Sequence, residues 1–185
     1  MRRSHMTDEP TANVTPGGGE QVAEARNVKV ETSGDGRPRV TVCAGTACVF
    51  AGSMAVHDAF VEELKAAGLE DKVEVSIIGC HGLCSQSPVA VYADATFYGK
   101  LKPENVKTVV AEHLKGGVPV EKYMYKDPAS GEVVRDWHDI PFYRQQTRIA
   151  LRNVGAVNPE SLDEAVAHGS YEAARKALTT MTPDE

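Results

Sequence analysis

The chain has 185 residues, a formal net charge of −6 and an ordinary apolar fraction. This length suits one compact domain with room for a small second one, and the acidic balance argues against nucleic-acid binding. No apolar run approaches membrane-spanning length, so membrane insertion is not expected. Arg2 and Arg3 are not followed by an apolar stretch and do not read as an export signal. We therefore expect a cytoplasmic protein, free or peripheral to a membrane complex, with its cysteines in a reducing compartment.

Residues 1–36 are polar and rich in Gly, Thr and Glu, which predicts a disordered leader. Directly after it, Val40 and Val42 alternate with polar neighbours and predict a short strand that runs into Cys43. Residues 44–47 are small, and we expect a tight loop there in which backbone amides can approach whatever the cysteines hold.

A helix is predicted from about residue 53 to residue 67, with Ser53 as its N-cap. Its buried stripe is expected at helical spacing, at Val56, Phe60, Val61 and Leu64. Gly68 stands where a left-handed residue closes a helix, and Leu69 is expected to fold back on Leu64.

A second strand through Val73, Val75 and Ile77 is expected to lead to Cys80. A strand pair over residues 88–92 and 95–98 should follow, and a last helix should run from Pro103 to Gly116. The resulting order, β-α-β-β-β-α, predicts an α/β fold of the thioredoxin-like type over residues 37–118, with a small mixed sheet and flanking helices.

The remainder of the chain predicts a linker over residues 119–140 and a short, mainly helical extension over residues 141–185. Within the extension, Asn158 and Pro159 are expected to start a helix that ends at Gly169, and Ser170 should cap a final helix. Three arginines spaced four apart would line one solvated helical face: Arg144, Arg148 and Arg152.

All the cysteines of the chain fall in two close pairs. Four residues separate Cys43 from Cys48, and three separate Cys80 from Cys84. Both pairs are expected on loops that follow strands and that lie side by side in this fold, so four thiolates can converge. A [2Fe–2S] cluster needs four such ligands.

The negative charge of such a cluster requires N–H donors around it. We expect these donors from Gly45, Thr46, Gly82 and the start of the first helix. Because four cysteines are available, His81 is expected to be a donor beside the site, or exposed, rather than a ligand. The other histidines, His113 among them, are expected at surface or boundary positions.

Two other kinds of site remain open at this point. A structural zinc ion also accepts four cysteines, although it usually shows Cys-x2-Cys spacing; the protein would then be a zinc-stabilised interaction domain. A thiol–disulfide oxidoreductase of thioredoxin-like fold normally uses a Cys-x-x-Cys motif.

Three motifs together resemble the thioredoxin-like [2Fe–2S] ferredoxin domain: Cys43-Ala-Gly-Thr-Ala-Cys48, Gly79-Cys-His-Gly-Leu-Cys84 and Pro88-Val-Ala-Val-Tyr92. Later stretches are similar to the opening of the NADH-binding flavoprotein subunit of NADH dehydrogenases and diaphorases, of the 51 kDa type. These stretches are 142–155, 159–162, 169–174 and 177–178.

The resemblance implies that Cys43, Cys48, Cys80 and Cys84 ligate a [2Fe–2S] cluster, the first two on one iron and the last two on the other. It implies a one-electron carrier within an NADH-linked oxidoreductase: an NADH dehydrogenase, or the diaphorase module of a hydrogenase or formate dehydrogenase. The expected partners are a flavin- and NADH-binding subunit or domain and other iron–sulfur subunits. The family's glycine-rich FMN and NADH region has no counterpart in the sequence, so we expect no FMN or NADH site in this chain and no catalysis by it alone.

Overall fold

The computed structural model describes residues 34, 36–182 and 184, so the predicted leader lies almost entirely outside the described residues. A four-stranded sheet has the order β2-β1-β3-β4. β1 and β2 are parallel, whereas β3 is antiparallel to both β1 and β4. The strands are β1 (Arg39–Cys43), β2 (Glu74–Ile78), β3 (Ala90–Tyr92) and β4 (Phe97–Tyr98). The predicted mixed sheet is therefore confirmed.

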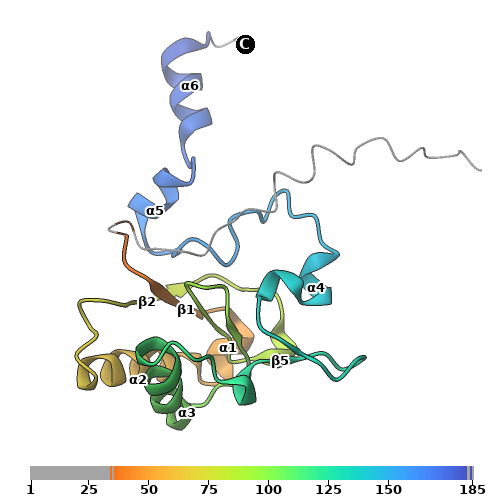
Figure 1. Ribbon diagram of the computed structural model, residues 1–185. Helices are drawn as coiled ribbons and strands as arrows, with labels where there is room; N and C mark the ends of the chain where they lie inside the picture. The colour runs from red at the N-terminus through yellow and green to blue at the C-terminus, as the bar shows by residue number, and fades with distance from the viewer. Residues whose placement is uncertain (1–33, 35, 183, 185) are drawn as a thin grey trace, which may run out of the picture.

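Two helices cover one face of this sheet (Figure 1). They are α2 (Ser53–Ala66) and α3 (Pro103–Val109), and the latter continues as the π-helix η3 (Val110–Lys115). Val56, Phe60 and Leu64 of α2 are buried as predicted, but Val61 is 46% exposed. One residue after Phe60 the helix has turned by about 100°, so Val61 points away from the sheet.

The ends of α2 show one confirmed and one wrong prediction. Gly68 is left-handed, with φ 65°, and the Leu69 N–H donates to the Leu64 carbonyl at 2.9 Å, as expected for this type of helix end. At the other end the N-cap is Gly52, with φ 94°, and Ser53 is already helical and buried. A left-handed glycine therefore makes the turn into α2 in place of a capping hydroxyl.

The other face of the sheet is also buried. Strand residues alternate between the faces, so Thr41, Cys43 and Val91 point away from α2 and α3. Residues 125–143 cover them, including part of the stretch predicted as a linker, and Phe97 N–H donates to the Arg135 carbonyl at 2.9 Å. The covering elements are β5 (Tyr125–Lys126), β6 (Val133–Val134), η5 (Trp137–Asp139) and α4 (Pro141–Arg144). The preceding η4 (Glu121–Tyr123) packs through Tyr123 against the core on the helical face.

A partly buried polar network ties the two faces together at the β3–β4 turn. His113 is only 3% exposed, and its ring nitrogens contact the Tyr98 hydroxyl at 2.8 Å and the Asp94 carboxylate at 3.1 Å. Arg135 also donates to Asp94. The expectation that His113 lies at a surface or boundary position is therefore wrong, because its two hydrogen bonds satisfy it inside the fold.

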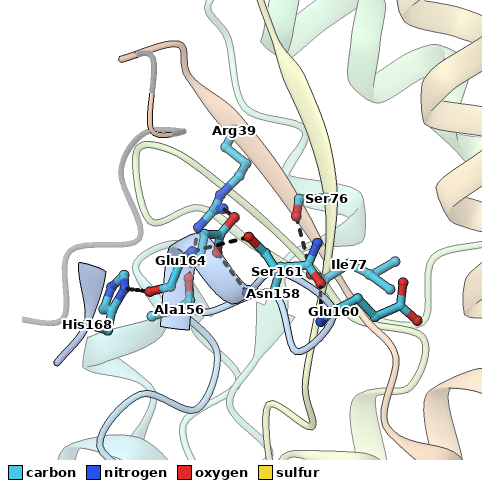
Figure 2. Close-up of polar contacts among 9 residues, drawn as sticks. All are labelled: Arg39, Ser76, Ile77, Ala156, Asn158, Glu160, Ser161, Glu164 and His168. Carbon is cyan, nitrogen blue, oxygen red and sulfur yellow. Dashed lines mark hydrogen bonds and ion pairs between the residues drawn. The ribbon is translucent and has the colours of Figure 1, made fainter. Parts of the chain in front are cut away.

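A partly buried ion pair attaches the C-terminal extension to β1 (Figure 2). Arg39 donates to the Glu164 carboxylate and to the Ala156 carbonyl, both at 2.8 Å. Glu164 also accepts the Asn158 N–H at 2.8 Å. The prediction that a helix starts at Asn158 is wrong, because this hydrogen bond holds Asn158 in the loop before α5 (Leu162–Ala167), whose N-cap is Ser161.

The last helix, α6 (Glu172–Thr180), extends away from the other elements (Figure 1). All of its residues are exposed. Its N-cap is Tyr171, with φ 67°, and not the predicted Ser170. In the part of the chain that the structure describes, no helix is long and apolar enough to cross a membrane.

Candidate metal centre

Parallel pairing of β1 and β2 places two of the cysteines at the same edge of the sheet. Cys43 ends β1 opposite Ile78, the last residue of β2, and the Ala44 N–H donates to the Ile78 carbonyl at 2.9 Å. Cys80 follows two residues later. Because the carboxyl ends of parallel strands lie together, the two loops that carry the cysteines are neighbours.

Gly45 lies where these two loops make their closest approach. A Cβ atom added at this residue would come within 2.9 Å of the Cys80 Cβ and 3.1 Å of its Sγ. The backbone of Gly45 has an ordinary φ of −63°, so it is space and not conformation that requires glycine here.

Cys48 lies on a helix and not in the predicted loop. The Val49 N–H donates to the Gly45 carbonyl at 2.9 Å and closes the first turn of α1 (Thr46–Phe50). The helix buries Cys48 in the second core, the cluster on this face of the sheet that consists of Cys43, Cys48, Val89, Val91, Phe97, Tyr125, Trp137, Ile140 and Tyr143. The Cys48 Sγ contacts the Ser87 hydroxyl at 3.1 Å. Cys84 starts the short 3₁₀ helix η2 (Cys84–Gln86).

All of the cysteines line one pocket with an empty volume of about 200 Å³. Cys43 and Cys48 form its buried side, whereas Cys80 and Cys84 are exposed. The pocket is completed by Gly45, Ala47, His81, Gly82, Leu83 and Val89. Within the described residues, no group of three or more His, Cys, Asp or Glu side chains is arranged around a point that suits a single metal ion. The chemistry of this donor set, four thiols in two pairs, fits a [2Fe–2S] cluster.

The two buried thiols ionise differently. A hydrogen bond from the Cys43 thiol lowers the pKa of Cys48 to about 6, and the Ser87 hydroxyl assists. The same hydrogen bond, together with burial, raises the pKa of Cys43. One of these thiols is therefore readily a thiolate, the form in which cysteine binds metals. Partial burial and the neighbouring Cys80 raise the pKa of Cys84.

Backbone N–H groups point at the buried sulfurs. The His81 N–H donates to the Cys43 Sγ at 3.4 Å. The backbone of Gly45 acts to lower the pKa of Cys43, and the backbone of Val89 acts to lower that of Cys48. The donor role predicted for Gly45 stays a prediction. Val89, which belongs to the motif at residues 88–92, comes to the site because it directly precedes β3, the antiparallel neighbour of β1.

The His81 side chain is buried behind the pocket and is only 1% exposed. Its Nδ1 contacts the Tyr143 hydroxyl at 2.7 Å, and its ring packs edge-on against Trp137 and Phe97. Burial, and then the charge of Arg148, lower the pKa of His81 to about 4. Sequence reasoning did not place Tyr143 and Arg148 at the site, because these residues lie more than sixty positions from His81, which they contact.

The comparisons with known proteins agree with this geometry. Residues 28–114, which include all four cysteines, match the family of thioredoxin-like [2Fe–2S] ferredoxins. A [2Fe–2S] ferredoxin from Aquifex aeolicus is 40% identical over 77 residues, which cover 40% of this chain and 69% of the relative. The HndA subunit of an NADP-reducing hydrogenase from Solidesulfovibrio fructosivorans is 30% identical over 82 residues, 42% of this chain and 47% of the subunit.

A solved thioredoxin-like [2Fe–2S] ferredoxin from Aquifex aeolicus is 33% identical, with a TM-score of 0.45, and the match covers 47% of this chain and 88% of that one. The fold and the four-thiol pocket define an iron–sulfur protein of thioredoxin-like fold. The chain belongs to the family of thioredoxin-like [2Fe–2S] ferredoxins. The family match ends at residue 114, before the segment that carries Trp137, Tyr143 and Arg148.

Proposed function

We propose that this chain is a one-electron carrier that holds a [2Fe–2S] cluster on Cys43, Cys48, Cys80 and Cys84. The observation that carries the proposal is that these four thiols, from two separate stretches of the sequence, line one pocket in two close pairs. Cys43 and Cys48 would hold one iron, and Cys80 and Cys84 the other. The cluster, when bound, supplies reversible uptake of a single electron.

The protein has three tasks in this function. The thiolates ligate the irons, and the backbone N–H groups of Gly45, His81 and Val89 compensate the negative charge at the buried sulfurs. The second core keeps water away from Cys43 and Cys48. The exposed pair, Cys80 and Cys84, leaves one side open, and we propose that electrons enter and leave there.

We further propose that the chain works within an NADH-linked oxidoreductase, with a flavin-bearing subunit and other iron–sulfur subunits as its partners. Its similarity to a hydrogenase subunit supports this proposal. Residues 37–118 would form the ferredoxin domain and 119–140 a connection, and 141–185 would be the beginning of a flavoprotein-subunit domain. A cytoplasmic location is in keeping with cysteines that act as thiolate ligands.

Metal and sulfide analysis after anaerobic purification tests the proposal. We expect about two irons and about two labile sulfides per chain, with a spin-one-half EPR signal after reduction. Changing Cys84 to Ser should remove most of the cluster, whereas changing the exposed Ser85 to Ala in the same loop should not. A colourless protein with one bound zinc, or a C43S variant that keeps its iron and loses disulfide reductase activity, would reject the proposal.

A further inference from the structure

Arg148 differs in its surroundings from Arg144 and Arg152, the arginines four positions before and after it. Arg144 and Arg152 are exposed, whereas Arg148 is half-buried against the loop that carries Cys80 and Cys84. Its Nη2 donates to the His81 carbonyl at 3.4 Å, and its Nη1 donates to the Val154 carbonyl at 3.2 Å. The interpretation of all three as one solvated helical face is therefore wrong: α4 ends at Arg144, and the chain then follows irregular turns.

Aromatic rings hold the Arg148 guanidinium in place. It lies 5.1 Å from the centre of the Tyr143 ring and 5.9 Å from that of Trp137. Both rings also contact the His81 ring. A Cβ atom added at Gly82 would be 4.0 Å from the Arg148 Nη2. The guanidinium therefore lies against His81 and Gly82. These two residues stand between Cys80 and Cys84 in the sequence.

The charges of Arg148 and of the cysteines both act on Tyr143. Burial raises the pKa of Tyr143; the charge of Arg148 opposes this rise, and those of Cys43, Cys80 and Cys48 add to it. Tyr143 therefore lies within electrostatic reach of a fixed cation on one side and of the pocket sulfurs on the other. In a partly buried setting such interactions are screened less than at the surface.

We propose that Arg148 is a positioning residue that raises the reduction potential of the cluster, through a positive charge fixed behind the cysteine loop. This inference rests on the proposed function. Reduction adds one electron from an external donor, with no bond made or broken, and so increases the negative charge in the pocket. Net charge and hydrogen bonding around a cluster set its potential, and a nearby cation favours the more negative, reduced form. Arg148 lies beyond residues 28–114, so this effect is an addition to the family's own cluster site.

The experiment uses the whole chain and four variants. Arg148→Gln removes the charge but keeps a polar amide, and Arg148→Lys keeps the charge. Arg144→Gln and Arg152→Gln remove equal charges from exposed positions in the same segment. The midpoint potential is read from an EPR-monitored redox titration with dithionite. Cluster content and far-ultraviolet circular dichroism show that each variant is folded and loaded.

We expect R148Q to lower the ratio of reduced to oxidised protein about tenfold at a fixed potential, which is about 59 mV for a one-electron couple. R148K should restore most of this shift, and R144Q and R152Q should stay close to the original protein. An R148Q shift no larger than that of the two exposed controls, or an R148K potential no higher than that of R148Q, would overturn the inference.

Two further outcomes are distinguishable. If R148Q does not fold, Arg148→Met carries the same comparison, because its long side chain can still pack on Tyr143 and Trp137. If the original protein holds no [2Fe–2S] cluster, it is the proposed function that fails, before any variant is compared.

Discussion

The two faces of the sheet are both buried, but by different kinds of structure. On one face, α2 and α3 cover Val40, Val42 and Ala90 with Phe60 and aliphatic side chains at regular helical spacing. On the other face, short irregular elements between residues 125 and 143 cover Cys43 and Val91, largely with aromatic rings. The cysteine pocket opens on this second side, and much of its cover lies beyond the family match.

The two faces therefore have different roles: the helical face stabilises the fold, and the cysteine face surrounds the pocket. The helical face holds a continuous apolar core and contains none of the cysteines. On the cysteine face the packed groups include His81, Trp137 and Tyr143, whose polar atoms and neighbouring charges can act on the pocket. We expect changes on the helical face to alter the free energy of unfolding alone, and changes on the cysteine face to alter the cluster as well.

The largest effect is expected at Gly45. Changing Gly45 to Ala places a methyl group against the Cβ and Sγ of Cys80 and should push the two cysteine loops apart. We expect more than about a tenfold loss of bound iron and sulfide, since ligand geometry and metal affinity are coupled. Gly79→Ala is the matched control, because a Cβ atom there meets nothing within 4 Å. Equal cluster content in the two variants would contradict this account of the pocket.

On the helical face, Phe60→Ala should reduce the free energy of unfolding by about 4 kcal/mol, because Phe60 is fully buried in the first core. Anaerobic urea unfolding followed by circular dichroism measures this loss. The EPR spectrum of the folded variant should stay unchanged. Val61→Ala, one position along and 46% exposed, should change stability by less than about 0.5 kcal/mol. An altered EPR spectrum in F60A would contradict the expectation that the helical face does not affect the cluster.

On the cysteine face, Ile140→Ala should cost about 3 kcal/mol, because Ile140 is fully buried beside Cys43 and Cys48. Unlike Phe60→Ala, it should also change the EPR spectrum or the rate at which the cluster is lost in air. Ile149→Ala, at a residue 78% exposed, serves as the control. If I140A and F60A both destabilise the chain and both leave the cluster unaffected, the second core does not influence the cluster.

The smallest effect is expected at the polar network that joins the two faces. Hydrogen bonds from His113, Thr96 and Arg135 hold the pKa of Asp94 below its usual range, although burial alone would raise it. Asp94→Asn should cost about 2 kcal/mol at pH 7. A lowered carboxyl pKa contributes stability above the unfolded pKa of about 4 and loses it as the pH falls below that value.

The difference between the original protein and D94N should therefore shrink in urea unfolding at progressively lower pH. Asp71→Asn, at an exposed aspartate on the loop before β2, removes one carboxylate outside this network and serves as the matched control. A stability difference that stays constant down to pH 3 would mean that the Asp94 carboxylate is not the source of the effect.

The sequence predicted those features that depend on local pattern. The spacing of Val56, Phe60 and Leu64 predicted α2, and Gly68 predicted where this helix ends. Alternating apolar residues predicted β1 and its partner β2. The parallel pairing of these strands brings the two cysteine loops together. These features need only a few neighbouring residues to specify them.

Features that depend on distant contacts could not be predicted in this way. Tyr143 and Arg148 approach His81 only after the chain has crossed the second face of the sheet. Asn158 is drawn out of a helical start by Glu164, which Arg39 holds from β1. The ligand roles of the four cysteines and the domain boundaries at 36, 118 and 140 stay predictions.

Mössbauer spectroscopy of protein loaded with ⁵⁷Fe tests the central claim most directly, because it reports the number, oxidation state and ligands of the irons. We predict a pair of sulfur-ligated ferric irons in the oxidised protein, of which one becomes ferrous on one-electron reduction. A single mononuclear iron, or a folded protein that retains no iron after anaerobic purification, would contradict the account.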